Sequence, residues 1–178
     1  MKARTASILT ILAATLLISD QWAEARSRNM DFDMFVRIKN ERLQTFAADY
    51  DIAISIADKA YLEKLEEIQK NAASERIRSV AQTEAERFAA SRNVPKEDAS
   101  NLPDEIRAAR KEFRAANEQA DQTRLRRTIG LLDAHIRQIQ SLHDVLRSSN
   151  PDDPMIPEII KELDHTRRAR AALFPKSE

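Results

Sequence analysis

A stretch of more than sixty residues, from Asn29 to Asn93, contains neither glycine nor proline, and it limits how the chain can fold. Its apolar residues recur at intervals of three and four, which places them on one face of an α-helix. Most residues between them are Ala, Glu, Lys, Arg and Gln, which lose little side-chain freedom in a helix. The sequence therefore predicts one helix over residues 30–92, roughly 95 Å long at about 1.5 Å per residue.

The apolar face of this predicted helix is nearly regular. It comprises Phe32, Phe35, Leu43, Phe46, Tyr50, Ala53, Ala57, Tyr61, Leu65, Ile68, Ala72, Ile77, Val80 and Phe88. The pattern skips from Ala72 to Ile77, and Asn71–Ser74 includes residue types that favour caps and turns. A second interpretation therefore stays open, in which the helix breaks near Asn71–Ser74.

Three isoleucines, Ile52, Ile54 and Ile56, lie off the main apolar face. Apolar side chains on a second face indicate a second covering partner. A helix of this length also needs partners along its surface in water. Homo-oligomerisation is one arrangement that would supply such a partner.

Two further helices follow the first. A turn that contains Pro95 covers residues 93–102, and a second helix, with Pro103 in its first turn, is predicted over residues 103–149. More prolines precede a third helix at residues 155–174, where Asp153 is placed to cap it. Gly130, the sole glycine, lies inside the second helix. A glycine at this position indicates either the close approach of another helix or a tolerated loss of helix stability, about 1 kcal/mol relative to alanine.

The lengths of these helices predict the architecture. A loop of about ten residues makes the first two helices antiparallel neighbours. The third helix, under about 30 Å long, can pack beside one end of the pair. We therefore predict an all-α fold, a long antiparallel, coiled-coil-like helical hairpin with a short third helix packing at its base. The alternative is a four-helix bundle, which follows if the first helix breaks.

Residues 1–25 have the three parts of a secretory signal peptide. A basic start precedes an apolar block at residues 6–19, and an Ala-x-Ala site ends at Ala25. A helix that spans a membrane needs about 20 apolar residues, and this block is shorter. We therefore predict cleavage after Ala25 and a single all-helical domain at residues 26–178, with no stable membrane insertion. The expected location is the periplasm, with secretion or association with the envelope as alternatives.

The composition argues against several functional classes. The chain has no cysteine, so it forms no disulfide and has no thiol nucleophile. Its 29 basic and 29 acidic residues balance, so no broad positive field attracts nucleic acid. One glycine cannot build a Gly-rich phosphate loop, and no serine lies in a Gly-rich nucleophile elbow. We expect no enzymatic activity and no cofactor.

Histidines are the remaining candidates for a ligand or metal site. His135 and His143 are eight residues apart and do not form the i,i+4 pair that binds a metal ion. Glu162 and His165 match Glu-x-x-His, but a di-metal helical bundle needs a second copy of that motif. The candidate ligands are therefore His143, Glu162 and His165. A hydrogen-bonded core role is the simpler interpretation of His143, because it falls on an apolar seam.

These features predict an exported, non-enzymatic protein that acts through protein–protein interaction, as a periplasmic scaffold, adaptor or chaperone. Val94 and Leu102, at the turn, are the candidate partner-binding residues, with packing against the turn as their alternative role. Two other functions stay open. One is a periplasmic helical bundle that senses a small molecule or metal, and the other is a subunit associated with a secretion apparatus or pilus.

Overall fold

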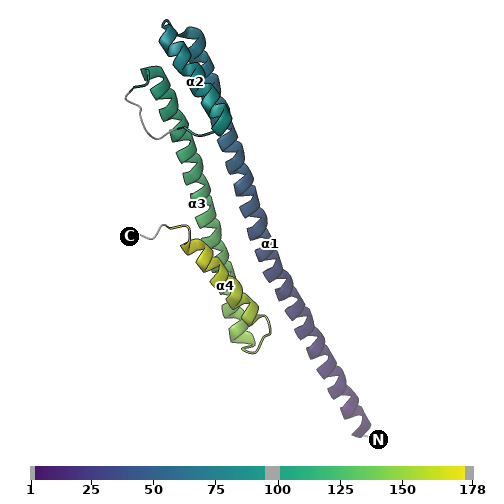
Figure 1. The fold of residues 1–178 in the computed structure, drawn as a ribbon. Helices are drawn as coiled ribbons and strands as arrows, with labels where there is room; N and C mark the ends of the chain where they lie inside the picture. Colours follow the sequence, from purple (N-terminus) through teal and green to yellow (C-terminus); the bar gives the residue numbers. More distant parts are fainter. Residues whose placement is uncertain (1–2, 95–100, 175–178) are drawn as a thin grey trace. The chain divides into compact units, whose positions relative to one another are not determined.

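The computed structural model describes the backbone of residues 3–94 and 101–174, and side chains from residue 31 onward within these ranges. Its helices are α1 (Ala3–Asn71), α2 (Glu75–Ser91), α3 (Asp104–Ser149) and α4 (Ile156–Ala171) (Figure 1). The described residues form no strand, so the predicted all-α class is confirmed. The predicted signal peptide, residues 1–25, lies outside the described side chains. Within the described residues, no helix is both long and apolar enough to cross a membrane.

The first predicted helix is interrupted, so the prediction of a continuous helix over residues 30–92 is wrong. Helix α1 ends at Asn71, and α2 begins at Glu75. Between them, Ser74 has φ −102° and ψ 132°, an extended conformation outside the helical region. The alternative with a break near Asn71–Ser74 is confirmed. The break has a packing reason, because α2 buries its apolar face on the other helices of its unit.

The chain divides into two compact units that share α1 and α3. The central unit comprises residues 44–128, and the terminal unit comprises residues 1–43 and 129–178. Each unit has its own hydrophobic cluster among the described residues. The sequence pattern led us to expect one all-helical domain over residues 26–178. The break after α1 supplies the short helix of the central unit, and α4 is the short helix of the terminal unit.

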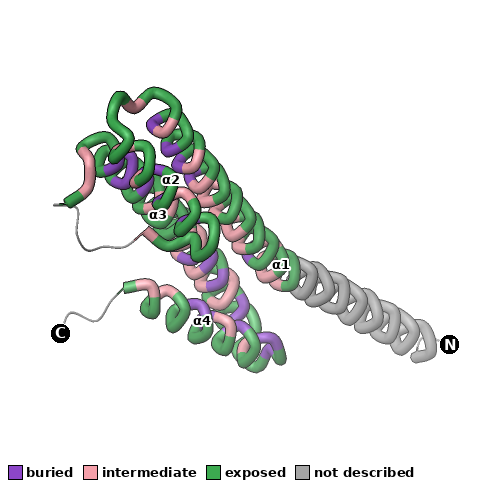
Figure 2. Tube along the Cα trace, turned by 45° about the horizontal axis from the view of Figure 1, so that its top comes forward, coloured by how far each residue is buried: buried purple, intermediate pink, exposed green. Residues whose placement is uncertain are grey.

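In the central unit, α1, α2 and α3 share one core. Its buried apolar residues are Ala57, Tyr61, Leu65, Ile68, Ala81, Phe88, Ile106, Ala109 and Phe113 (Figure 2). The Tyr61 ring centroid lies 4.9 Å from that of Phe113 and 5.0 Å from that of Phe88. Earlier on α1, Asp49 pairs with Arg127, which lies later on α3. The two helices therefore run antiparallel within this unit, as predicted.

In the terminal unit, α4 packs against segments of α1 and α3. The buried apolar residues are Ile139, Leu146, Met155, Ile159 and Leu163, with Phe32 and Phe35 of α1 partly buried against them. The N-cap residue of α4 is Met155, not the predicted Asp153, and no side chain caps the helix. Oδ1 of Asp153 accepts a hydrogen bond from the Met155 N–H at 2.9 Å, in the turn before the helix. Helix α4 therefore corresponds to the predicted short third helix.

Candidate functional site

Glu84 of α2 is the centre of a buried charged cluster in the central unit. Its two carboxylate oxygens accept hydrogen bonds from Nε and Nη2 of Arg110, both at 2.7 Å. The Tyr61 hydroxyl donates to Oε1 of Glu84 at 2.8 Å. The Glu84 and Arg110 side chains are only 5% and 6% exposed, so this bidentate pair is shielded from water. The three residues come from three helices, so the cluster links α1, α2 and α3.

The protonation states of this cluster are set by its own contacts. Burial opposes ionisation of Glu84, but hydrogen bonds from Arg110 and Tyr61 outweigh burial and lower the pKa of Glu84. The hydrogen bond to Glu84 raises the pKa of Arg110. Burial, followed by the hydrogen bond to Glu84, raises the pKa of Tyr61 well above its usual value. A general acid or base works best with a pKa near the ambient pH, so this cluster is suited to a structural role.

Glu162 of α4 is the centre of a second cluster, which lies in the terminal unit. Its Oε1 accepts hydrogen bonds from Nζ of Lys39 at 2.5 Å and from Oγ1 of Thr166 at 3.1 Å. Nε2 of His135 lies 2.9 Å from the same oxygen. The Lys39 and His135 side chains are 6% and 3% exposed. Because Lys39 lies on α1 and His135 on α3, the cluster joins α4 to both long helices.

Burial decides the protonation of His135. Burial lowers the pKa of His135, the hydrogen bond to Glu162 opposes this effect, and the charge of Lys39 adds to it. Burial also opposes ionisation of Glu162, but hydrogen bonds from Lys39 and His135 bring the pKa of Glu162 below its usual value. The lowered pKa favours the neutral form of His135, and in that form a proton on Nε2 allows the ring to donate to the Glu162 carboxylate. Arg170 and Asp133 form a further ion pair between α4 and α3.

The structure does not assemble the predicted ligand set of His143, Glu162 and His165. Glu162 is engaged by the cluster around it. His143 is partly buried, and its Nδ1 lies 3.2 Å from Oδ1 of Asp144. His165 is exposed. Among the side chains that are described, no group of three His, Asp or Glu residues is placed to hold a metal ion.

The two predicted partner-binding residues lie on either side of the turn. Val94 and Leu102 are both partly buried and pack against the core of the central unit. Residues 95–100, between them, lie outside the described part. The placement of both side chains fits the alternative interpretation, in which they hold the turn against the helices.

Sequence reasoning missed Glu84 in the first cluster and Lys39 in the second, although a signal was present. Lys39 fills the gap between Phe35 and Leu43 in the apolar face of the first predicted helix. Glu84 fills the equivalent gap four residues before Phe88. A polar residue at interior spacing indicates a buried polar group, which needs a partner to offset its loss of hydration.

An open groove lies between α1 and α3 of the central unit, beyond the last buried residues of the core, Ala57 and Phe113. It is lined by Phe46, Asp49, Tyr50, Ala53 and Ile56 of α1 and by Ala116, Gln119, Ala120, Thr123, Arg124 and Arg127 of α3. Its volume is about 340 Å³. No residue in the ranges 44–56 and 114–128 is buried. Within the part of the chain that the structure describes, these two ranges therefore form a two-helix segment without a covering helix.

Arginines of α3 pack over aromatic rings of α1 at one end of the groove. The guanidinium carbon of Arg124 lies 4.8 Å from the centre of the Tyr50 ring, and that of Arg127 lies 5.6 Å from the centre of the Phe46 ring. Arg127 also donates to Oδ2 of Asp49 at 2.8 Å. Both members of this ion pair are about half exposed, so it contributes at most about 1 kcal/mol.

Two large apolar side chains beside the groove face solvent. Ile52 is 59% exposed and Ile56 is 64% exposed, one turn apart on α1. Ile56 also lines the groove. The expectation that these residues lack a cover within the chain agrees with their exposure. Large apolar side chains next to a groove are typical of a surface that contacts another protein.

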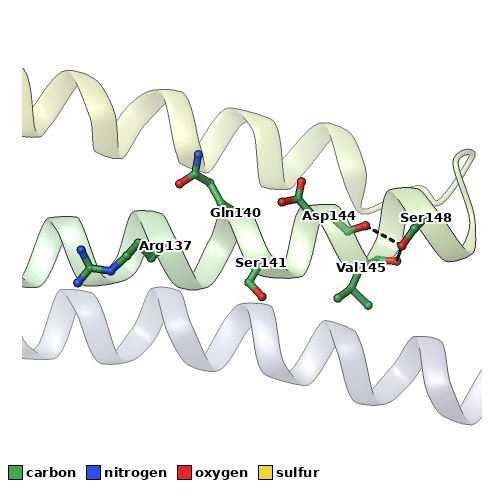
Figure 3. Close-up of a pocket in the computed structure, with 6 residues that line it drawn as sticks. All are labelled: Arg137, Gln140, Ser141, Asp144, Val145 and Ser148. Atoms are coloured by element: carbon green, nitrogen blue, oxygen red, sulfur yellow. Dashed lines mark hydrogen bonds between the residues drawn. The ribbon is translucent and has the colours of Figure 1, made fainter.

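A second hollow lies along α3 in the terminal unit. It is lined by Arg137, Gln140, Ser141, Asp144, Val145 and Ser148 (Figure 3). Oγ of Ser148 donates to the backbone oxygens of Asp144 and Val145, at 2.8 and 3.0 Å, so this hydroxyl is engaged by its own helix. Side chains from one helix do not surround a ligand, so this hollow is a weaker candidate than the groove.

The described residues thus form an all-α fold with two helical cores, two buried charged clusters and a groove between α1 and α3 of the central unit. A comparison of the chain with models of protein families, with curated proteins and with solved structures finds no match. The geometry of the described residues is therefore the basis for a functional assignment.

Proposed function

We propose that the chain is an exported, non-enzymatic helical protein that acts as a scaffold or adaptor by binding protein in the groove of the central unit. The observation that carries this proposal is the groove itself, together with the exposed Ile52 and Ile56 beside it. Export is supported by the signal-peptide pattern in residues 1–25.

The neighbouring part of the same unit indicates what this surface lacks. From Ala57 onward, the apolar face of α1 is covered by α2 and α3. Before Ala57, the apolar pattern of α1 continues through Tyr50 and Ala53, but no residue of that stretch is buried. A protein partner would complete the packing that α2 supplies further along the unit.

The energetic gain from such a partner is substantial. Full burial of an isoleucine side chain is worth about 1.5–3 kcal/mol. Ile52 and Ile56 are both more than half exposed, so covering them would contribute roughly 2–4 kcal/mol before the losses of association. The charged clusters are less suited to binding, because their buried side chains already satisfy one another.

Site-specific photocrosslinking in producing cells tests this proposal. A photoreactive residue at position 56 should give a discrete adduct of higher mass, identifiable by mass spectrometry. The matched control is the same residue at Ile160, which is 45% exposed on α4, and it should give no such adduct. Equal labelling at both positions, or none at position 56, would contradict the assignment of the groove.

A further inference from the structure

The uncovered segment of two antiparallel helices has the arrangement of half a four-helix bundle. Its walls are residues 44–56 of α1 and 114–128 of α3, and neither range contains a buried residue. Two antiparallel helices are covered on a whole face by another antiparallel pair, as in a four-helix bundle. The segment is therefore suited to a partner that presents two helices rather than one extended peptide.

The same segment carries both a projecting and a receiving surface. Ile52 and Ile56 project from α1. Three of the eleven residues that line the groove next to them are alanines, Ala53, Ala116 and Ala120, which leave room for a side chain of a partner. Helices pack by inserting large side chains of one partner between side chains of the other. A surface that holds both parts side by side can pack against a copy of itself, which is the requirement of a two-fold interface.

The charges of the segment are also complementary to themselves. Residues 44–56 of α1 contain two aspartates and neither lysine nor arginine. Residues 114–128 of α3 contain four arginines, one glutamate and one aspartate. A copy related by a two-fold axis can place its acidic α1 against the basic α3 of the first, and the same contact then occurs twice. A partner of one uniform charge would match only one of the two helices.

We infer that the protein that fills the groove of the central unit is a second copy of this chain, which packs its own two-helix segment there as an isologous four-helix bundle. This inference rests on the proposed function, because it names the partner of the same surface. The inference adds that no other protein is required to fill the groove, so the purified chain alone should dimerise.

Sedimentation equilibrium of the purified full chain over a wide concentration range tests the inference. The unsubstituted chain should fit a monomer–dimer equilibrium. Ile56→Lys should raise the dimer dissociation constant by at least about 100-fold, because two-fold symmetry places two buried charges in the interface. Ile160→Lys, a change of the same kind at an exposed residue of α4, should leave the constant unchanged within about threefold.

Circular dichroism melting of each variant checks that the monomer stays folded, because both substituted residues are exposed in the single chain. A chain that is monomeric at every concentration would overturn the inference. So would a dimer that Ile56→Lys does not weaken, or an open series of larger assemblies. A monomeric chain that still crosslinks to a different protein through position 56 would overturn the dimer but leave the proposed function standing.

Discussion

Replacing Glu84 with glutamine should destabilise the protein strongly, although the change adds no bulk. Glutamine has nearly the same volume, so the core around it stays filled. The substitution removes the negative charge that faces Arg110 and replaces one acceptor oxygen with a donor NH₂ group. Arg110 then remains as a buried guanidinium without a counter-charge.

The structure gives the size of the expected loss. The two hydrogen bonds between Arg110 and Glu84 are charge-assisted, at 2.7 Å each, and such bonds contribute about 1.5–3 kcal/mol apiece. Removing one partner of a buried ion pair costs about 3–5 kcal/mol. The side chains are only 5% and 6% exposed, so solvent screening does little to reduce this loss. We expect the free energy of unfolding to fall by about 3–5 kcal/mol.

Urea denaturation followed by circular dichroism measures this change. With a slope of about 1–3 kcal/mol per molar urea, the midpoint should fall by at least about 1 M. Glu86→Gln is the matched control, because Glu86 is exposed on the same helix and should change stability by less than about 0.5 kcal/mol. The low pKa of Glu84 adds a pH dependence. Its stabilisation is full above the unfolded-state pKa and is lost as pH falls through the lower folded-state pKa.

A combined variant separates the buried charge from a general loss of packing. Replacing Glu84, Arg110 and Tyr61 together by Leu, Met and Phe removes every polar group of the cluster at once. Apolar replacement of a complete buried ion pair is often neutral or stabilising, so this variant should be more stable than Glu84→Gln. If Glu84→Gln costs less than about 1 kcal/mol, or if the triple variant is the less stable one, the electrostatic reasoning is refuted.

Two further predictions concern the terminal unit. The free energy of unfolding should decrease as pH falls below about 6.5, because the folded-state pKa of His135 is lower than its unfolded-state value. Urea titrations at pH 5–7 measure this dependence, and the substitution His135→Gln should flatten it. Gly130→Ala should stabilise the protein by up to about 1 kcal/mol and raise Tm by roughly 2–4 °C in calorimetry, because a Cβ there would meet no heavy atom within 4 Å. A lower Tm for Gly130→Ala would instead indicate a close neighbour.

Local sequence signals were sufficient to predict the helices but not how they share their cores. Prolines and the apolar spacing predicted helices over 103–149 and 155–174, close to α3 and α4. The weak apolar pattern at Asn71–Ser74 left the break undecided, because caps and turns there contribute little compared with tertiary packing. The gain from packing α2 on the other helices decided it, and no local pattern reports that gain.

The candidate site was also predictable only in part, because its contacts depend on tertiary packing that local sequence patterns do not report. Glu162 was singled out through its spacing to His165, yet its partners are Lys39 and His135, which are distant in sequence. Their positions in the apolar faces indicate burial, but the identity of the partner depends on how the helices pack. Exposed Ile52 and Ile56 were predictable, because their spacing places them off the main face whatever covers that face.

The buried cluster of the central unit has a consequence for the groove in the same unit. Helices with repeating apolar faces can shift along each other by one turn with little loss of burial, whereas a bidentate pair is satisfied in one register only. The exposed pair of Asp49 and Arg127 is too weak to set that register alone. Glu84 of α2 is bonded both to Arg110 of α3 and to Tyr61 of α1, so the cluster as a whole determines which residues of α1 and α3 face each other in the groove. The groove contains no buried residue, but it can keep a fixed shape because the core beside it sets the alignment of α1 against α3.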